Sequence, residues 1–276
     1  MQKDALQTTE KACEEIARLC DPDRFFCAMF LPPAAREAAF SLIALNCELV
    51  KALVLPVSGQ VTGPMAGLIR LQWWRDVVEE PQRGRLARHD VAIAIADLLE
   101  SGRVSSSSLL TLIDAREAEL SRLPDWQAWR EAMLDSAGEM QRMIGSLLGE
   151  QDEALLFAMK RAGTAFGVGV LIRHLPQVLL SGRFPLPEEC LMEAGLSHDA
   201  DGASLLDGNR LAGVVQRLRA EGVAFLPDRQ TIRKGGLAML PATLAVRDLR
   251  RDPVGVNATR GLGDRCAVIW AGIRRR

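Results

Sequence analysis

Seven polar residues of this chain are candidates for binding a phosphate or a metal ion. They are Arg24, Asn46, Glu48, Lys51, Arg173, His174 and Arg183. Most of them lie in two predicted helical stretches, residues 38–54 and 166–187. Carboxylates four residues apart on a helix share one face and can hold Mg²⁺ against a diphosphate. The first stretch has one carboxylate, Glu48, and the second has none, so the sequence predicts no metal site and no catalytic residues there.

Cationic side chains at these positions favour the binding of an anion without a metal. Lys51 and Arg173 could clamp a diphosphate, as cations on a helix face do for phosphates. Holding a diphosphate is easier than ionising it, because the charge that develops on the leaving group must be stabilised in a dry site. Arg24 and Arg183 could line the mouth of a pocket, or they could form salt bridges with nearby acids.

The other candidates have structural interpretations. Asn46 and Glu48 are two residues apart, so they face different directions on a helix and are not expected to share a metal. A buried Glu48 opposite Arg173 would join the two helices by an ion pair in place of a metal, and this is a hypothesis. His174 lies in an apolar neighbourhood. We predict that it is a hydrogen-bonded core histidine rather than a base.

The elements that position these residues are predicted to be helical almost throughout. Pro32 and Pro33 open a helix where a missing N–H costs nothing, and Pro56 and Gly59 end it. Apolar residues at helical spacing predict the other helices. These cover 65–80, 91–101, 107–122, 125–148, 152–180, 204–221 and 234–250. Tyrosine is absent and aromatic residues make up 5% of the chain, which weakens any β interpretation. We expect a single all-α domain over residues 1–276, with a basic tail from about 251.

The helix predicted over 152–180 contains three glycines, Gly163, Gly167 and Gly169. Each costs roughly 1 kcal/mol relative to alanine in a helix interior, so a compensating interaction is expected. Gly163 and Gly167 lie one turn apart, so they could let a second helix approach the backbone closely, or they could line a tunnel for an apolar ligand chain. Close helix packing is the favoured interpretation. A dinucleotide site is not expected, because the spacing is not GxGxxG and no strand precedes it.

The net charge of −1 argues against bulk nucleic-acid binding, but the charge is unevenly distributed. Residues 207–276 contain 14 Lys+Arg and 6 Asp+Glu, a net charge of +8, which leaves −9 for residues 1–206. The basic tail, which ends in three arginines, could contact anionic lipid or an acidic partner. The alternative is a solvated helix face followed by a frayed terminus.

Composition also indicates where in the cell the protein is expected and whether it contacts a membrane. Six cysteines are scattered without a CxxC motif or neighbouring histidines, so they predict neither a zinc site nor a disulfide framework. The most apolar uncharged run, 162–172, has 11 residues, short of the roughly 20 that a membrane helix needs. The first residues are acidic and contain no apolar signal core. We expect a cytoplasmic protein, with any contact to the inner membrane peripheral.

Six segments, in their order along the chain, resemble the squalene/phytoene synthase family over roughly residues 20–250. They are AAFSLIALNCELVKA (38–52), RLQWWRD (70–76), LIRHLP (171–176), GRFPLP (182–187), AGL (194–196) and LPATL (240–244). The resemblance implies an all-α isoprenoid synthase-like helical bundle with a central cavity. Family members condense two prenyl diphosphates head to head, and two helical aspartate pairs hold the Mg²⁺.

Those aspartates have no counterparts when the chain is aligned on the family framework. The first pair would fall at Val50-Lys51 and Val54, and the second would fall at His174 and Val178. Valine offers no ligand, and neutral histidine is a poor partner for Mg²⁺. The active-site tyrosines of the family are missing as well, since the chain has no tyrosine.

The patterns Asn46-x-Glu48, 70–76 and Leu-Ile-Arg173-x-Leu-Pro176 are most similar to a non-catalytic branch of the family that includes assembly factors of mitochondrial respiratory complex I. This resemblance implies an assembly or lipid-binding module without a cofactor. Its partner would be a respiratory-complex subunit or an isoprenoid or other lipid. The alternative is a divergent head-to-head prenyltransferase that condenses farnesyl or geranylgeranyl diphosphate to squalene or phytoene and uses Mg²⁺.

Overall fold

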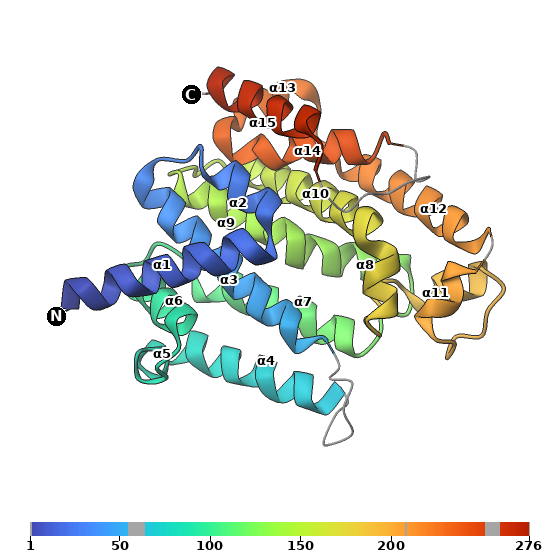
Figure 1. Cartoon of the computed structure of the whole chain (residues 1–276), viewed down its shortest axis with the longest axis horizontal. Coiled ribbons are helices and arrows are strands. Elements are labelled where there is room, and N and C mark those ends of the chain that lie inside the picture. Colours follow the sequence, from blue (N-terminus) through green and yellow to red (C-terminus); the bar gives the residue numbers. More distant parts are fainter. Residues whose placement is uncertain (1, 55–63, 208, 252–259, 276) are drawn as a thin grey trace.

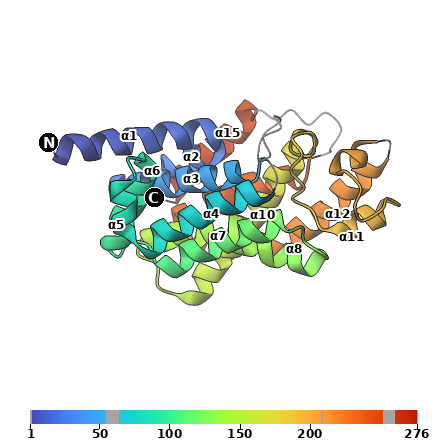
Figure 2. The same cartoon turned by 90° about the horizontal axis from the view of Figure 1, so that it is seen from below.

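The computed structural model describes residues 2–54, 64–207, 209–251 and 260–275. The described part of the chain is helical, and its one β feature is an isolated bridge between Leu123 and Pro187. The predicted all-α class is therefore confirmed. Figure 1 shows α10 running through the middle of the molecule, and Figure 2 shows the same arrangement from below.

The α-helices follow one another with short connections. In chain order they are α1 (Gln2–Cys20), α2 (Pro22–Ala28), α3 (Pro33–Ala52), α4 (Pro64–Glu79), α5 (Pro81–Leu86), α6 (Asp90–Glu100), α7 (Ser106–Leu120), α8 (Trp126–Met133), α9 (Glu139–Leu147), α10 (Glu153–Leu180), α11 (Glu188–Glu193), α12 (Arg210–Phe225), α13 (Arg229–Lys234), α14 (Leu240–Asp248) and α15 (Leu262–Arg274). A π-helical turn, η1 (Leu134–Gly138), joins α8 to α9, and two 3-10 turns are η2 (Gly202–Leu206) and η3 (Gly236–Met239).

Most predicted helices are confirmed to within two residues at each end, and two need correction. The helix predicted over 204–221 begins later, at Arg210, and continues to Phe225. The helix predicted over 234–250 is composite, because a 3-10 turn precedes α14. Pro241, in the first turn of α14, fits that late start, since proline is favoured there.

Prolines set where four helices begin. Pro22, Pro33, Pro64 and Pro81 are the first residues of α2, α3, α4 and α5. Their fixed φ suits the first helical position, where the missing N–H breaks no bond. Asp21 adds a cap to α2, since its Oδ1 accepts a hydrogen bond from the Arg24 backbone N–H at 3.0 Å.

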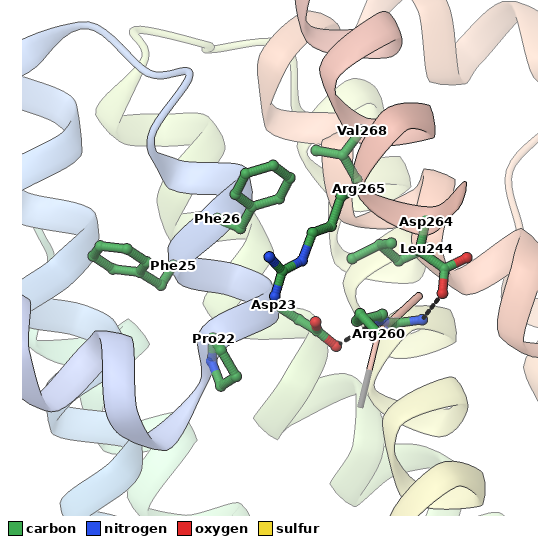
Figure 3. Close-up of a pocket in the computed structure, with 9 residues that line it drawn as sticks. All are labelled: Pro22, Asp23, Phe25, Phe26, Leu244, Arg260, Asp264, Arg265 and Val268. Carbon is green, nitrogen blue, oxygen red and sulfur yellow. Dashed lines mark hydrogen bonds and ion pairs between the residues drawn. The ribbon is translucent and has the colours of Figure 1, made fainter. Parts of the chain in front are cut away.

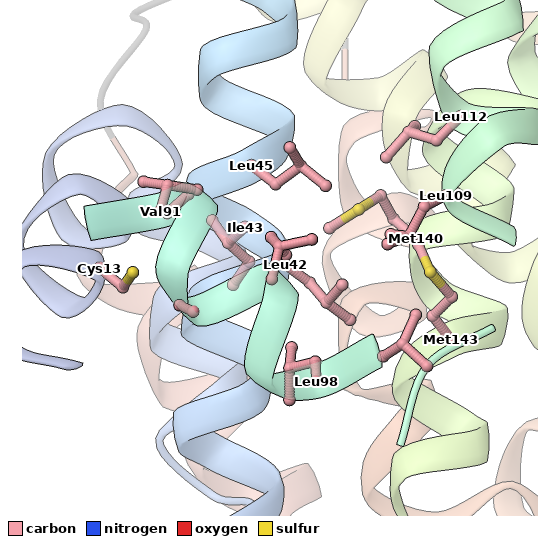
Figure 4. Close-up of a cluster of buried hydrophobic side chains, with 14 of the residues drawn as sticks. Cys13, Leu42, Ile43, Leu45, Val91, Leu98, Leu109, Leu112, Met140 and Met143 are labelled. Atoms are coloured by element: carbon pink, nitrogen blue, oxygen red, sulfur yellow. The ribbon is translucent and has the colours of Figure 1, made fainter. Parts of the chain in front are cut away.

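Two larger groups of buried side chains and one small group form the described hydrophobic core. The first group joins α1, α3, α6, α7 and α9, and Leu42, Ile43, Leu109 and Met140 in it are fully buried (Figure 4). The second group joins α8, α10, α12, α14 and α15. The small group lies at the start of α10, beside η3 and α14. Between the two larger groups, α3 and α10 line a common space.

The glycines of α10 allow its neighbours to approach closely. A Cβ at Gly163 would overlap the Gln141 side chain and lie 2.8 Å from the Ala137 carbonyl oxygen. A Cβ at Gly169 would lie 3.0 Å from Cβ of Asp248 on α14. The predicted close helix packing is thus confirmed at Gly163, and Gly169 packs closely as well, which explains why residues of poor helix propensity occupy these positions.

Helix α10 also corrects the prediction that no stretch could span a bilayer. By length and composition alone it is long and apolar enough, with a mean hydropathy of 1.5. However, 67% of its apolar window is buried inside the protein. The central helix of a bundle has this composition because it is enclosed on most sides.

Replacement of Gly163 by alanine tests the close contact with η1 and α9. We expect Gly163→Ala to lower the free energy of unfolding by about 1–3 kcal/mol, because the new methyl group overpacks the contact. The matched control is Gly213→Ala in α12, where an added Cβ meets no atom within 4 Å; it should raise stability by roughly 0.5–1 kcal/mol. Urea unfolding measures both, and a stabilising Gly163→Ala would contradict the packing.

Candidate functional site

A cavity of about 620 Å³ lies between α2, α3, α7, α8, η1 and α10. Its wall is largely apolar, with Trp129, Met133 and Leu171 among the lining residues. The central cavity expected from the resemblance is therefore present. Gly167 of α10 also lines it, so at this glycine close packing on Ala137 and an open cavity wall occur together.

The two candidate helices contribute residues one turn apart to the cavity. Asn46 and Val50 line it from α3, Val54 lines it from the turn after α3, and His174 and Val178 line it from α10. Positions separated by four residues lie on one helix face, which explains why Asn46 and Val50, and likewise His174 and Val178, point the same way. Val50, Val54, His174 and Val178 thus lie at one cavity, and none of the four carries a carboxylate.

A buried cluster of charge lies on the α7 side of the cavity. Arg183 donates a hydrogen bond from Nη2 to Glu119 Oε2 at 2.9 Å, and a second from Nε to Oε1. Arg116 approaches Glu119 from the same helix, with Nη1 at 3.4 Å from Oε2. The Nη2 of Arg116 also donates to Oδ1 of Asn46 at 2.9 Å. Asn46 is therefore a structural link between α3 and α7.

Burial and neighbouring charges set the protonation of this cluster. Burial alone would raise the pKa of Glu119, but Arg183 and Arg116 outweigh it and hold the pKa below its usual value. Burial lowers the pKa of Arg116 to about 10; Glu119 opposes this change, and the positive charges of Arg183 and Arg24 add to it. Glu119 is thus ionised at neutral pH, and it compensates two guanidinium groups.

Arg24 supplies a third guanidinium group from α2. It donates to Oδ2 of Asp21 at 3.1 Å and to the Ala137 carbonyl oxygen at 3.1 Å. Its guanidinium lies over the Phe166 ring, 4.9 Å from the centroid. Within the described residues, Nε of Arg24 and Nε of Arg116 are buried without a hydrogen-bond partner. Both residues line the cavity, but the two Nε atoms have almost no accessible surface, so they are unpaired donors inside the wall rather than contact points for a ligand.

Arg24, Asn46, His174 and Arg183 of the predicted set line this cavity, whereas the other three predicted residues do not. Lys51 and Glu48 form an ion pair with each other at 2.7 Å on α3. Arg173 is buried and lies 3.6 Å from Oδ1 of Asp248 on α14. The hypothetical Glu48–Arg173 ion pair is therefore wrong.

The predicted Lys51–Arg173 clamp is not assembled either. Consecutive residues of a helix point about 100° apart. Because Val50 and His174 face the cavity, Lys51 and Arg173 are turned away from it. Arg24 and Arg183 were expected either to line a pocket or to form salt bridges. Each does both, because each lines the cavity and pairs with an acid.

His174 is half-buried at the cavity wall rather than enclosed in the core. Burial lowers its pKa, and the positive charge of Arg173 adds to the effect. The imidazole is therefore neutral at pH 7. A neutral imidazole suits transition metals better than Mg²⁺, and no group of three or more His, Cys, Asp or Glu side chains in the described part of the chain is placed to hold a metal ion.

A second cavity, of about 230 Å³, lies between α2, α14 and α15 (Figure 3). Arg260 crosses its wall: Nε lies 2.8 Å from Asp23 Oδ2, Nη2 lies 2.7 Å from Asp248 Oδ2, and Nη1 lies 3.8 Å from Asp264 Oδ2. Asp248 and Asp264 are both buried. This network joins α2, α14 and α15, and its charges are paired with one another within the protein. We therefore interpret it as structural.

Arg116, Glu119 and Arg260 were missed by the sequence analysis. The first two carry a weak local signal, an Arg and a Glu three apart on a helix whose other inward residues, Leu109, Leu112 and Ile113, are apolar. Such a pair is usually a solvated surface pair. Its burial depends on Arg183, which lies 64 residues further along the chain.

Helices packed around a central cavity define the isoprenoid synthase class of folds, and solved structures agree. The fold is similar to squalene synthase HpnC from Alicyclobacillus acidocaldarius, with a TM-score of 0.61 and 19% identity; the match covers 88% of this chain and 92% of that one. A dehydrosqualene synthase in complex with ligand gives a TM-score of 0.66 and 11% identity, covering 97% and 96%. At these identities the likeness shows the fold alone.

Residues 17–251 match the squalene/phytoene synthase family, and the chain belongs to this family. It is similar to the NADH dehydrogenase (ubiquinone) complex I, assembly factor 6, of Bos taurus and of Homo sapiens, at 26% identity over 197 residues, or 69% of this chain and 56% of each relative. The Drosophila melanogaster homolog is 28% identical over 204 residues, covering 68% and 57%. The chain spans about half the length of these curated relatives.

Loss of the Glu119 charge should destabilise the fold. We expect Glu119→Gln to cost about 3–5 kcal/mol of unfolding free energy, because it leaves two buried guanidinium groups uncompensated. The control on the same helix is Glu117→Gln, whose partner Arg75 lies at 2.8 Å near the surface; it should cost less than about 1 kcal/mol. Equal losses in urea unfolding would contradict the buried cluster.

The protonation of His174 should make stability depend on pH. Its folded pKa is lowered, so the unfolded chain binds the proton first, and stability falls as the pH drops below about 6.5. We expect His174→Gln to reduce the loss of unfolding free energy between about pH 7.5 and pH 5.5. The exposed His198→Gln is the matched control, and identical pH profiles for His174→Gln and the wild type would refute the assignment.

Proposed function

We propose that this protein is a non-catalytic member of the squalene/phytoene synthase family that acts as an assembly factor for respiratory complex I and holds a lipid in its cavity. The observation that carries the proposal is the set of side chains at the aligned motif positions. Val50, Val54, His174 and Val178 line the cavity, and they offer a diphosphate-bound Mg²⁺ no carboxylate.

The charges that remain at the cavity do not replace a metal. Ionising a diphosphate requires preorganised positive charge at the leaving group. Arg183 and Arg116 share the single carboxylate of Glu119, and Arg24 pairs with Asp21. Each of the three guanidinium groups is therefore engaged by an acid of the protein, which lowers the positive charge that it can offer a leaving group.

The cavity supports binding of a ligand with an apolar chain and an anionic head. Its volume of about 620 Å³ lies within the roughly 300–1,000 Å³ of small-molecule sites. The apolar wall of Trp129, Met133 and Leu171 suits the chain, and the three arginines that line the cavity, Arg24, Arg116 and Arg183, suit the head. An isoprenoid or another lipid has this combination of groups.

Similarity to the assembly factors of Bos taurus, Homo sapiens and Drosophila melanogaster supports the complex I part of the proposal. On this proposal the protein acts from the cytoplasm, at the periphery of the inner membrane, and its partner is a complex I subunit. The second candidate is a divergent prenyltransferase that makes squalene or phytoene with Mg²⁺. One observation favours it: the fold has a central cavity, as the resemblance to the family implied.

Incubation of the purified protein with labelled farnesyl and geranylgeranyl diphosphate separates the two candidates. With or without Mg²⁺ we expect no squalene or phytoene, and any binding should be independent of Mg²⁺ and weaker in Arg116→Gln. Arg70→Gln, an exposed arginine on α4, is the control for loss of charge. Product formation would establish the prenyltransferase.

A genetic experiment tests the role in assembly. Deletion of the gene in its own organism should lower assembled complex I on native gels, and the wild-type gene should restore it. Normal complex I in the deletion strain would refute the assembly role, whatever the cavity binds.

A further inference from the structure

Helix α15 presents an apolar stripe to the outside of the protein. Its four large exposed apolar side chains are Leu262 (81% exposed), Ile269 (41%), Trp270 (59%) and Ile273 (65%). Their spacing of three, four and seven residues gathers them on one face of the helix. Figure 1 shows α15 along the upper edge of the molecule, beside α13 and α14.

The opposite face of α15 is fixed to the fold. Asp264 and Val268 are fully buried, and Asp264 accepts hydrogen bonds at 2.6 Å from Arg247 and from Arg251. A Cβ at Gly272 would lie 2.7 Å from Cε1 of Phe30, so the helix packs closely on the chain after α2. Residues 262–274 are therefore an anchored helix rather than a frayed terminus, and the stripe is held facing outward.

The surface around the stripe is cationic. Arg274 is exposed on α15 beside Trp270, and Arg250 and Arg251 are exposed directly after α14. Across the described residues 240–251 and 260–275, the two carboxylates are Asp248 and Asp264, and both are buried in ion pairs. The surface thus presents arginines to the solvent without exposed carboxylates among those residues.

An apolar helix face with flanking arginines fits an anionic lipid surface. Helices of this kind lie in the plane of the membrane interface, with apolar side chains among the acyl chains and cations at the phosphates. Tryptophan favours that interface because its ring is amphipathic. The Arg274 guanidinium lies 4.2 Å from the Trp270 ring centroid, so cation and aromatic ring are at the same level. The stripe is one helix wide and convex, a shape that suits a fluid surface.

We propose that α15 docks this protein on an anionic lipid bilayer. The helix lies parallel to the membrane, Leu262, Ile269, Trp270 and Ile273 enter the interface, and Arg274 contacts lipid phosphates. This proposal does not rest on the proposed function, since α15 does not line the central cavity.

Flotation with phosphatidylcholine vesicles, with and without phosphatidylglycerol, tests the docking. The wild type should float with the anionic vesicles. We expect Ile269→Ser/Ile273→Ser to lower the partition coefficient at least about tenfold, because two apolar side chains no longer enter the interface. Replacing Arg274 by glutamine should lower it roughly fivefold.

The matched controls lie at the opposite edge of the molecule in Figure 1, on α4 and α5. Ile69→Ser/Leu86→Ser removes two side chains that are 61% and 81% exposed, and it should leave the partition coefficient unchanged. Arg70→Gln is the charge control. Thermal unfolding of each variant shows that lost flotation does not come from lost folding.

Tryptophan fluorescence gives a second readout at the stripe itself. Anionic vesicles should shift the emission to the blue, and Trp270→Phe should remove the shift while Trp73→Phe keeps it. The proposal is overturned if the α15 variants float like the wild type, or if neutral vesicles bind equally well. It is also overturned if the serine variants abolish self-association without vesicles, which would make a second copy of the chain the occupant of the stripe.

Discussion

Buried carboxylates constrain the arrangement of the C-terminal half of the fold. Asp248 of α14 and Asp264 of α15 are enclosed, and a buried carboxylate requires cationic partners. Arg173 of α10 and Arg260 supply charge to Asp248, and Arg260 also reaches Asp23 of α2. The three elements α2, α10 and α14 are therefore positioned together. The same constraint fixes α15, because the Asp264 that anchors it faces inward and the apolar stripe faces outward.

The charges at the central cavity are paired in a different way. Arg24 pairs with Asp21, and Arg116 and Arg183 share Glu119. This internal pairing offsets part of the cost of burying the charges. It also limits what the cavity can do, because charge already engaged within the protein is not available to a leaving group. An anion that enters the cavity meets arginines that are already paired with Asp21 and Glu119.

Local patterns predicted the fold well and the site in part. Prolines and apolar periodicity are properties of neighbouring residues, so α3, α4, α6, α7 and α10 were predicted to within two residues. The resemblance to the family placed Val50 and His174 at motif positions, and both line the cavity. The pairings did not follow from local patterns, because they join distant residues: Arg116 reaches Asn46 across 70 positions and Arg183 reaches Glu119 across 64. Sequence placed Arg173 on the correct helix, but it could not show that Asp248 would pair with it.

The π-helical turn η1 has a consequence for how the two larger hydrophobic cores are connected. A π turn adds one residue to an α-helix, which rotates everything beyond it by about 100°. Before the turn, Trp126 and Trp129 belong to the second core; after it, Met140 and Met143 belong to the first. The continuous helical segment from α8 to α9 therefore packs against the second core with its first half and against the first core with its second half. The number of residues in this segment, more than the identity of any one residue, sets which side chains face each core.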